Sequence, residues 1–125
     1  MLKIGSFPIV KEKTIFKEAI EKMSEFNLGI LCIVDDETKL KGIITDGDLR
    51  RMLLSIQKPF SAFFIDDVIK HSKKNPITSF PEENIKETLI KMNSSKVWDM
   101  PIIENEKLVG LVHLHPAIKN LVSKI

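Results

Sequence analysis

The chain has 125 residues, of which 43% are hydrophobic, enough for one compact domain or two interlocked half-domains. Its 19 lysine and arginine residues nearly balance 17 acidic residues, and a net charge of +2 gives no electrostatic reason to expect a nucleic acid or an anionic membrane as partner. No apolar run approaches the roughly 18 residues that a membrane span needs, and the N-terminus lacks the layout of a signal peptide. We therefore expect a cytoplasmic protein.

The first half of the chain predicts helix, strand, strand, helix. Residues 14–27 carry apolar side chains at the three-and-four spacing of a one-sided helix. Residues 30–34 form a continuous apolar strand, and a polar turn separates it from a second strand at 42–45. Residues 46–54 begin with acidic side chains and carry arginines later, which is the charge order that a helix dipole favours.

A connector and a second series follow. In the connector, residues 66–70 predict a helical turn and residues 71–76 a polar linker. The second series predicts a helix at 83–94, strands near 100–103 and 109–113, and a final helix near 116–122. Pro116 suits the first turn of that helix, where its missing N–H costs nothing.

These two series are an internal repeat at a spacing of about 69 residues. The segment IVDD at 33–36 returns as IIEN at 102–105, and LKGIIT at 40–45 returns as LVGLVH at 108–113. Each unit is too short to bury its own apolar faces and must pack against its copy, which makes the seam between the copies the natural place for a ligand. We predict an α+β fold with pseudo-two-fold symmetry, divided into repeat 1 (1–55), a connector (56–75) and repeat 2 (76–125).

Those segments resemble a tandem pair of cystathionine beta-synthase (CBS) domains, in which two β-α-β-β-α repeats form a regulatory module. The strongest match is GIITDGDLRR at residues 42–51, which is similar to the strand-to-helix ligand loop of that family. The lead-in at 5–10 and GLVHLH at 110–115 are most similar to the C-terminal CBS pair of bacterial D-arabinose 5-phosphate isomerases. In such enzymes a preceding sugar isomerase domain converts ribulose 5-phosphate to arabinose 5-phosphate for Kdo and lipopolysaccharide synthesis. A sugar-phosphate nucleotidyltransferase is the competing parent.

Thr45 and Asp48 match the ribose-binding motif of the family. A carboxylate accepts hydrogen bonds from two neighbouring hydroxyls, and the threonine hydroxyl can serve a sugar or a phosphate. The same pattern at a helix start is also a capping box, which needs no ligand. Gly47 gives the loop room for a close approach to a ligand, whereas the carboxylates of Asp46 and Asp48 would repel a phosphate there.

A phosphate would instead reach toward Arg50, Arg51 or basic groups of the other copy, although both arginines also suit a solvated helix face. In the second copy His113 stands where Thr45 stands, and Pro116 stands where Asp48 stands. A proline cannot hold a ribose. We therefore expect one functional site, or two unequal ones.

Three other residues are candidates in the second copy. His113 and His115 lie two apart on a strand and share a face toward the cleft or the absent catalytic domain, but a zinc site needs three or four ligands and this pair has no obvious third. Trp98 matches Gly29 and could stack on a base; packing in the core or in a dimer explains it equally well. Cys32, the single cysteine, is expected to be a small buried hydrophobic residue.

The first hypothesis is a regulatory module that forms a homodimer, is tethered to a sugar isomerase domain, requires no cofactor, and binds AMP, ATP, CMP or CMP-Kdo near Thr45 and Asp48. The second is a purely structural oligomerisation module without a small ligand. A catalytic role for these residues is not expected, because no Ser, His and Asp set, paired catalytic carboxylates or phosphate loop is present.

Overall fold

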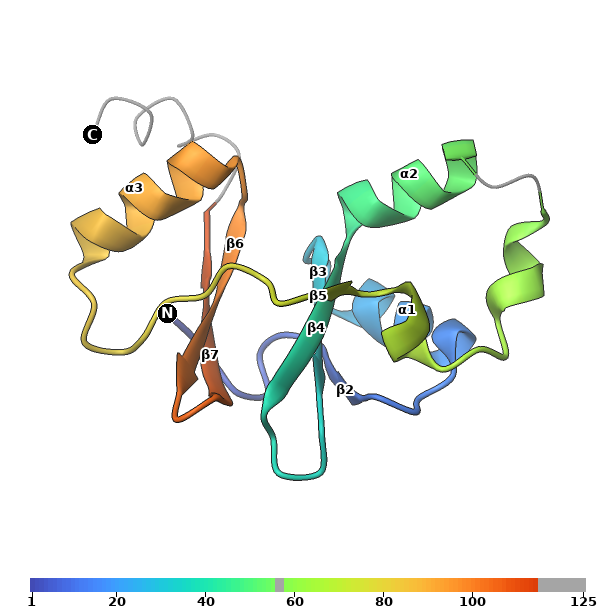
Figure 1. The fold of residues 1–125 in the computed structure, drawn as a ribbon, viewed down its shortest axis with the longest axis horizontal. Coiled ribbons are helices and arrows are strands. Elements are labelled where there is room, and N and C mark those ends of the chain that lie inside the picture. The colour runs from blue at the N-terminus through green and yellow to red at the C-terminus, as the bar shows by residue number, and fades with distance from the viewer. Residues whose placement is uncertain (56–57, 115–125) are drawn as a thin grey trace.

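The computed structural model describes residues 1–55 and 58–114, and within them two β-sheets lie side by side with helices on their outer sides (Figure 1). No helix among these residues is long and apolar enough to cross a membrane. In chain order the elements are β1 (Leu2–Lys3), β2 (Ile9–Lys11), α1 (Phe16–Glu25), β3 (Ile30–Val34), β4 (Leu40–Thr45), α2 (Asp46–Ser55), the 3-10 turns η1 (Phe60–Phe63) and η2 (Val68–His71), β5 (Lys73–Lys74), α3 (Ile85–Ser95), β6 (Asp99–Glu104) and β7 (Lys107–His113).

The two sheets exchange their edge strands. The first sheet has the order β2-β3-β4-β5 and the second has the order β1-β7-β6. Strand β1, which leads into repeat 1, pairs with β7 of repeat 2, and β5, which leads into repeat 2, pairs with β4 of repeat 1. Each repeat therefore completes the sheet of the other, which makes the two repeats parts of one folding unit.

The hairpins of the two repeats share their irregularities. The β3–β4 pair has a bulge between Ile33 and Val34, and the β6–β7 pair has one between Ile102 and Ile103, 69 residues later. The turns of the hairpins also bond to each other reciprocally. Those two hydrogen bonds run from the N–H of Leu40 to the carbonyl of Glu106 (3.0 Å) and from the N–H of Leu108 to the carbonyl of Thr38 (3.0 Å). The predicted α+β architecture with internal pseudo-two-fold symmetry is confirmed.

The core runs through the seam between the repeats. One buried cluster combines side chains of β3 and β4 with Leu108 and Leu111 of β7. Cys32 belongs to this cluster and is fully buried, as predicted, and burial raises the pKa of its thiol to about 12. A second cluster lies between β3 and α1, where Phe16, Ala19 and Met23 provide the buried face predicted from their spacing.

The helices and strands predicted for the described residues are confirmed within a few residues at each end. The polar linker predicted at 71–76 was wrong in part. Lys73–Lys74 forms β5 at a sheet edge, where main-chain pairing suffices and apolar alternation is not needed, and His71 packs against Phe16 with ring centroids 5.0 Å apart. The final helix predicted near 116–122 lies outside the described residues.

Candidate functional site

The junction between β4 and α2 forms a reciprocal capping box. The Asp48 carboxylate accepts from the N–H of Thr45 at 2.9 Å, and the Thr45 hydroxyl oxygen accepts from the N–H of Asp48 at 3.2 Å. Arg51, one turn further along α2, donates from Nη2 to Asp48 Oδ1 at 2.6 Å. Partial burial alone would raise the pKa of Asp48, but the bonds from Thr45 and Arg51 outweigh it and hold the pKa below its usual range.

Asp46 occupies a different environment from Asp48. It is exposed at the first turn of α2, and its N–H donates to the carbonyl of Gly29 at 3.0 Å. A side chain at Gly29 would place its Cβ 2.8 Å from Asp46 Oδ2, so the absence of a side chain at Gly29 makes room for this carboxylate. At Gly47 an added Cβ would meet only side-chain atoms at ordinary distances, the nearest being Arg51 Nη1 at 3.4 Å.

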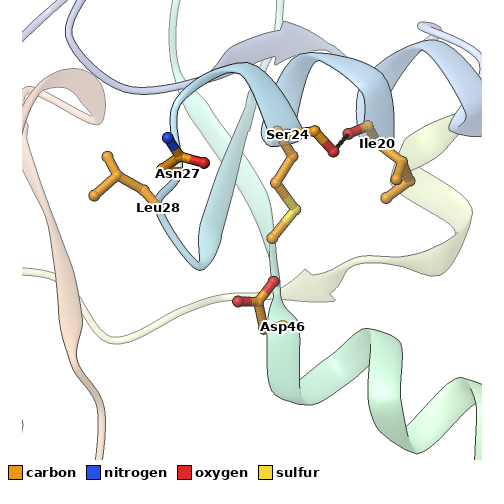
Figure 2. Close-up of a pocket in the computed structure, with 6 residues that line it drawn as sticks. Ile20, Ser24, Asn27, Leu28 and Asp46 are labelled. Atoms are coloured by element: carbon orange, nitrogen blue, oxygen red, sulfur yellow. Dashed lines mark hydrogen bonds between the residues drawn. The ribbon is translucent and has the colours of Figure 1, made fainter. Parts of the chain in front are cut away.

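An open pocket of about 390 Å³ lies between the C-terminal end of α1 and the start of α2 (Figure 2). Its wall combines apolar side chains with the polar groups of Ser24, Asn27 and Asp46, and the Ser24 hydroxyl is already bonded to the Ile20 carbonyl at 3.1 Å. An apolar wall beside a carboxylate and an amide suits a ligand with one flat apolar part and several hydroxyls. The lining residues are Ile20, Met23, Ser24, Asn27, Leu28 and Asp46.

The second repeat carries a different polar pair in the equivalent region. His113 Nδ1 lies 2.7 Å from Asp99 Oδ1, and these side chains are 30% and 8% exposed. Burial raises the pKa of Asp99 above its usual range. The hydrogen bond with His113 lowers this pKa in part, whereas the negative charge of Asp46 raises it further. A charge of repeat 1 thus contributes to the raised pKa of a carboxyl group of repeat 2.

The backbone confirms the alignment of the two loops. The N–H of Leu114 donates to the carbonyl of Trp98 at 2.8 Å, as the N–H of Asp46 does to the carbonyl of Gly29. Trp98 is half-buried and immediately precedes β6. The two equivalent junctions therefore differ in size at this position, with a tryptophan in one repeat and a glycine in the other.

The structure groups the predicted residues into two sets. Thr45 and Arg51 each bond to Asp48, and His113 bonds to Asp99. Arg50 is exposed on α2. His115 and Pro116 lie outside the described residues. That His113 and His115 share one face of the strand therefore stays a prediction.

Sequence reasoning missed Asp99 and the wall of the pocket. Asp99 stands at the start of a buried strand, where an acidic residue needs a partner, and this is the signal that could have identified it. Within the described part of the chain, no group of three or more histidine, cysteine, aspartate or glutamate side chains is placed to hold a metal ion.

Comparisons with known proteins agree with this fold. Residues 1–55 match the family model of the CBS domain. The crystal structure of the CBS domain pair of protein MJ0100, in complex with 5-methylthioadenosine and S-adenosyl-L-methionine, superposes with a TM-score of 0.75 over 99% of this chain and 94% of that one, at 22% identity. The crystal structure of CBSX2 in complex with AMP superposes with a TM-score of 0.77 over 90% and 85% of the chains, at 23% identity. Residues 1–55 thus match the CBS domain, and the chain has the fold of solved CBS domain pairs.

Sequence relatives are longer than this chain. The arabinose 5-phosphate isomerase KdsD of Francisella tularensis is 32% identical over 120 residues, which are 95% of this chain and 35% of that protein. An uncharacterised protein of Rickettsia prowazekii is 32% identical over 93% of this chain and 34% of its own length. The chain therefore spans about a third of these curated relatives.

Proposed function

We propose that this CBS pair is a regulatory module that binds an adenine or cytidine nucleotide, or a nucleotide sugar, at the seam between its repeats. The observation that carries the proposal is the open pocket beside Asp46, where an apolar wall lies next to a carboxylate and an amide. Its lining belongs to repeat 1, and in this proposal the ligand extends from it toward the His113–Asp99 pair of repeat 2. A ligand that contacts both repeats can favour one arrangement of them over another. Regulation requires this difference in affinity between arrangements.

The two aspartates of the loop have separate roles in this proposal. Asp46 is exposed beside the pocket and accepts hydrogen bonds from the ribose hydroxyls. Asp48 already accepts hydrogen bonds from Thr45 and Arg51, so its main role is to position the loop. Its remaining lone pairs can accept additional hydrogen bonds from the ligand. The base lies against the apolar side chains of Met23 and Leu28.

Two features support this ligand class. Both solved relatives described above hold adenosine-containing ligands, and the pocket of about 390 Å³ joins an apolar wall to a carboxylate. His113 and Arg51 are the candidates for the phosphate, and Trp98 is the alternative to Met23 and Leu28 as the surface for the base. The similarity to arabinose 5-phosphate isomerases supports a parent enzyme of the Kdo pathway, in which this module responds to a nucleotide or nucleotide-sugar product.

A structural role without a ligand is the second candidate. In this role the capping box serves only to stabilise the start of α2. Helix α2 has no buried residue, and its Leu53 and Leu54 are 62% and 82% exposed. An exposed apolar helix of this kind suits a homodimer in which two CBS pairs meet.

Calorimetric titration with AMP, ATP, CMP and CMP-Kdo distinguishes the two functions. We expect one ligand to bind the purified chain, and Asp46→Asn to weaken binding at least tenfold without changing the melting temperature. Asp48→Asn serves as the matched variant, since it is expected to lower the melting temperature as well as the affinity. A folded sample that binds none of the four ligands would support the structural role instead.

A further inference from the structure

The outer face of repeat 2 exposes apolar side chains around the start of α3. Ile85, the first residue of α3, is 61% exposed, and Phe80 in the preceding segment is 51% exposed. Ile77, ahead of Phe80, is 41% exposed. We call Ile77, Phe80 and Ile85 the α3 face. Ile90 lies five positions after Ile85, about 140° further round the helix, and is not part of it. Large apolar side chains that stay exposed at the start of a helix indicate a place that another segment can cover.

The equivalent place in repeat 1 is already covered by the connector. Phe16, the first residue of α1, is 69 positions before Ile85 and is fully buried. Its ring lies 5.5 Å from that of Phe60 and 5.0 Å from that of His71, both in the connector. In Figure 1 the connector, drawn in green and yellow, passes beside α1 before it enters β5. Val68, on η2, is fully buried in the same cluster.

Main-chain hydrogen bonds hold the connector at that place. The N–H groups of Phe16 and Lys17 donate to the carbonyls of Asp66 (2.8 Å) and Phe64 (3.0 Å). In return, the N–H of Val68 donates to the carbonyl of Thr14 at 2.8 Å. The connector thus supplies both apolar contacts and acceptors for the free N–H groups of the first turn of α1.

The symmetry of the fold identifies which segment would cover the α3 face. The connector covers α1 immediately before it becomes β5, and β5 is the counterpart of β1. Lys74 pairs with Gly42 in β4, as Lys3 pairs with Gly110 in β7. The counterpart of the connector is therefore a segment that enters β1 from its N-terminal side.

We propose that the α3 face is the docking surface for such a segment, an apolar and aromatic linker that joins a preceding domain to β1. The inference rests on the proposed function in one respect, namely that the module works within a longer protein, as its curated relatives are about three times its length. The linker covers Ile85 as the connector covers Phe16. It thereby ties the position of the preceding domain to the start of α3.

The first turn of α3 shows what this linker has to supply. Asn84 Oδ1 accepts from the N–H of Lys86 at 2.8 Å, whereas the cap residue of α1, Ile15, makes no side-chain bond. The side-chain cap replaces the carbonyl that the connector gives to Lys17. The linker on α3 therefore contributes apolar side chains, and it needs fewer main-chain acceptors than the connector on α1.

A graft of the connector tests the docking surface directly. Residues 58–71 are fused ahead of Met1, because Met1 lies against Gly110 as Ser72 lies against Gly42. We expect the melting temperature to rise by about 3–6 °C, a shift typical of roughly 1 kcal/mol in a chain of this size. Amide hydrogen exchange is expected to slow in the first turn of α3. The matched control carries serine at the three grafted phenylalanines and is expected to lose both effects.

Two results would overturn the inference. One is a graft that raises the melting temperature by the same amount whether its phenylalanines are kept or replaced by serine, or whether the chain that carries it has isoleucine or serine at position 85. The other is an ungrafted chain that is a dimer by light scattering and becomes a monomer with Ile85→Ser, because a second copy would then cover the face. Neither result depends on nucleotide binding. Titration of the grafted and ungrafted chains reports separately on the proposed function.

Discussion

Replacing Gly42 by alanine should destabilise the protein at the place where β5 pairs with β4. An added Cβ would lie 2.6 Å from Ser72 Oγ, 3.1 Å from Ser72 Cβ and 3.2 Å from the carbonyl oxygen of Lys73. The Ser72 hydroxyl cannot turn away freely, because it donates to the carbonyl of Ile69 at 2.8 Å. Loss of that bond costs about 1 kcal/mol. The remaining backbone contact forces β5 to shift, which adds about 1–2 kcal/mol of overpacking.

We therefore expect Gly42→Ala to lower the free energy of unfolding by about 2–3 kcal/mol, measured by urea denaturation followed by circular dichroism. Gly47→Ala is the matched control. Its added Cβ would meet nothing closer than 3.4 Å, and a glycine in a helix is about 0.5–1 kcal/mol less favourable than alanine, so this variant should be slightly more stable than wild type. The change Ser72→Gly removes the two closest contacts, and it should recover at least about 1 kcal/mol of the Gly42→Ala loss in a double-mutant cycle.

The reasoning would be refuted by a Gly42→Ala protein within about 0.5 kcal/mol of wild type, the range of surface changes that touch nothing specific. It would also be refuted by strict additivity with Ser72→Gly. Either result would mean that the segment of Ser72 and β5 does not pack tightly against Gly42 of β4.

Three further predictions concern single side chains. Asp99→Asn should stabilise the protein at pH 7, because the pKa of Asp99 is raised and its charged form therefore costs stability above that pKa. The stabilities of the two proteins should converge once the pH falls below the usual pKa of an aspartate. Asp48→Ala should cost about 1 kcal/mol at pH 7 by removal of the cap. This loss should fade as the pH drops through the lowered pKa of Asp48, while Arg51→Ala, with a 67% exposed side chain, should cost less. Cys32 should react with Ellman's reagent only in urea, and labelling of the native protein at the rate of a free thiol would contradict its burial.

The sequence predicted those elements whose pattern is decided locally. β3 was placed at its observed bounds, because five consecutive apolar residues are required where every position is buried. The capping box at Thr45 and Asp48 was one of two interpretations of the same spacing, and the structure forms that box. The ribose-binding interpretation stays a prediction, since a carboxylate in a capping box keeps lone pairs for a ligand.

What the sequence could not predict depends on contacts between distant segments. β5 consists of two lysines and has no apolar pattern, so only its pairing with β4 identifies it as a strand. Asp99 has its partner His113 fourteen positions away across a hairpin, and the charge that further raises its pKa, that of Asp46, comes from the other repeat. Neither relation produces a periodic signal along the chain.

If the proposed function holds, the exchange of edge strands provides a route from the ligand to a domain joined ahead of β1. A domain joined ahead of β1 would be connected to the sheet of repeat 2, because β1 pairs with β7. The loop with Asp46 belongs to repeat 1, and the charge of Asp46 contributes to the raised pKa of Asp99 in repeat 2. A ligand held by both repeats would therefore act on the same sheet that carries the linker. The effect of the ligand on a tethered domain is limited to the difference in the ligand's affinity for the two arrangements of the repeats. A ligand that contacts only repeat 1 has no such difference, so it would bind without regulating.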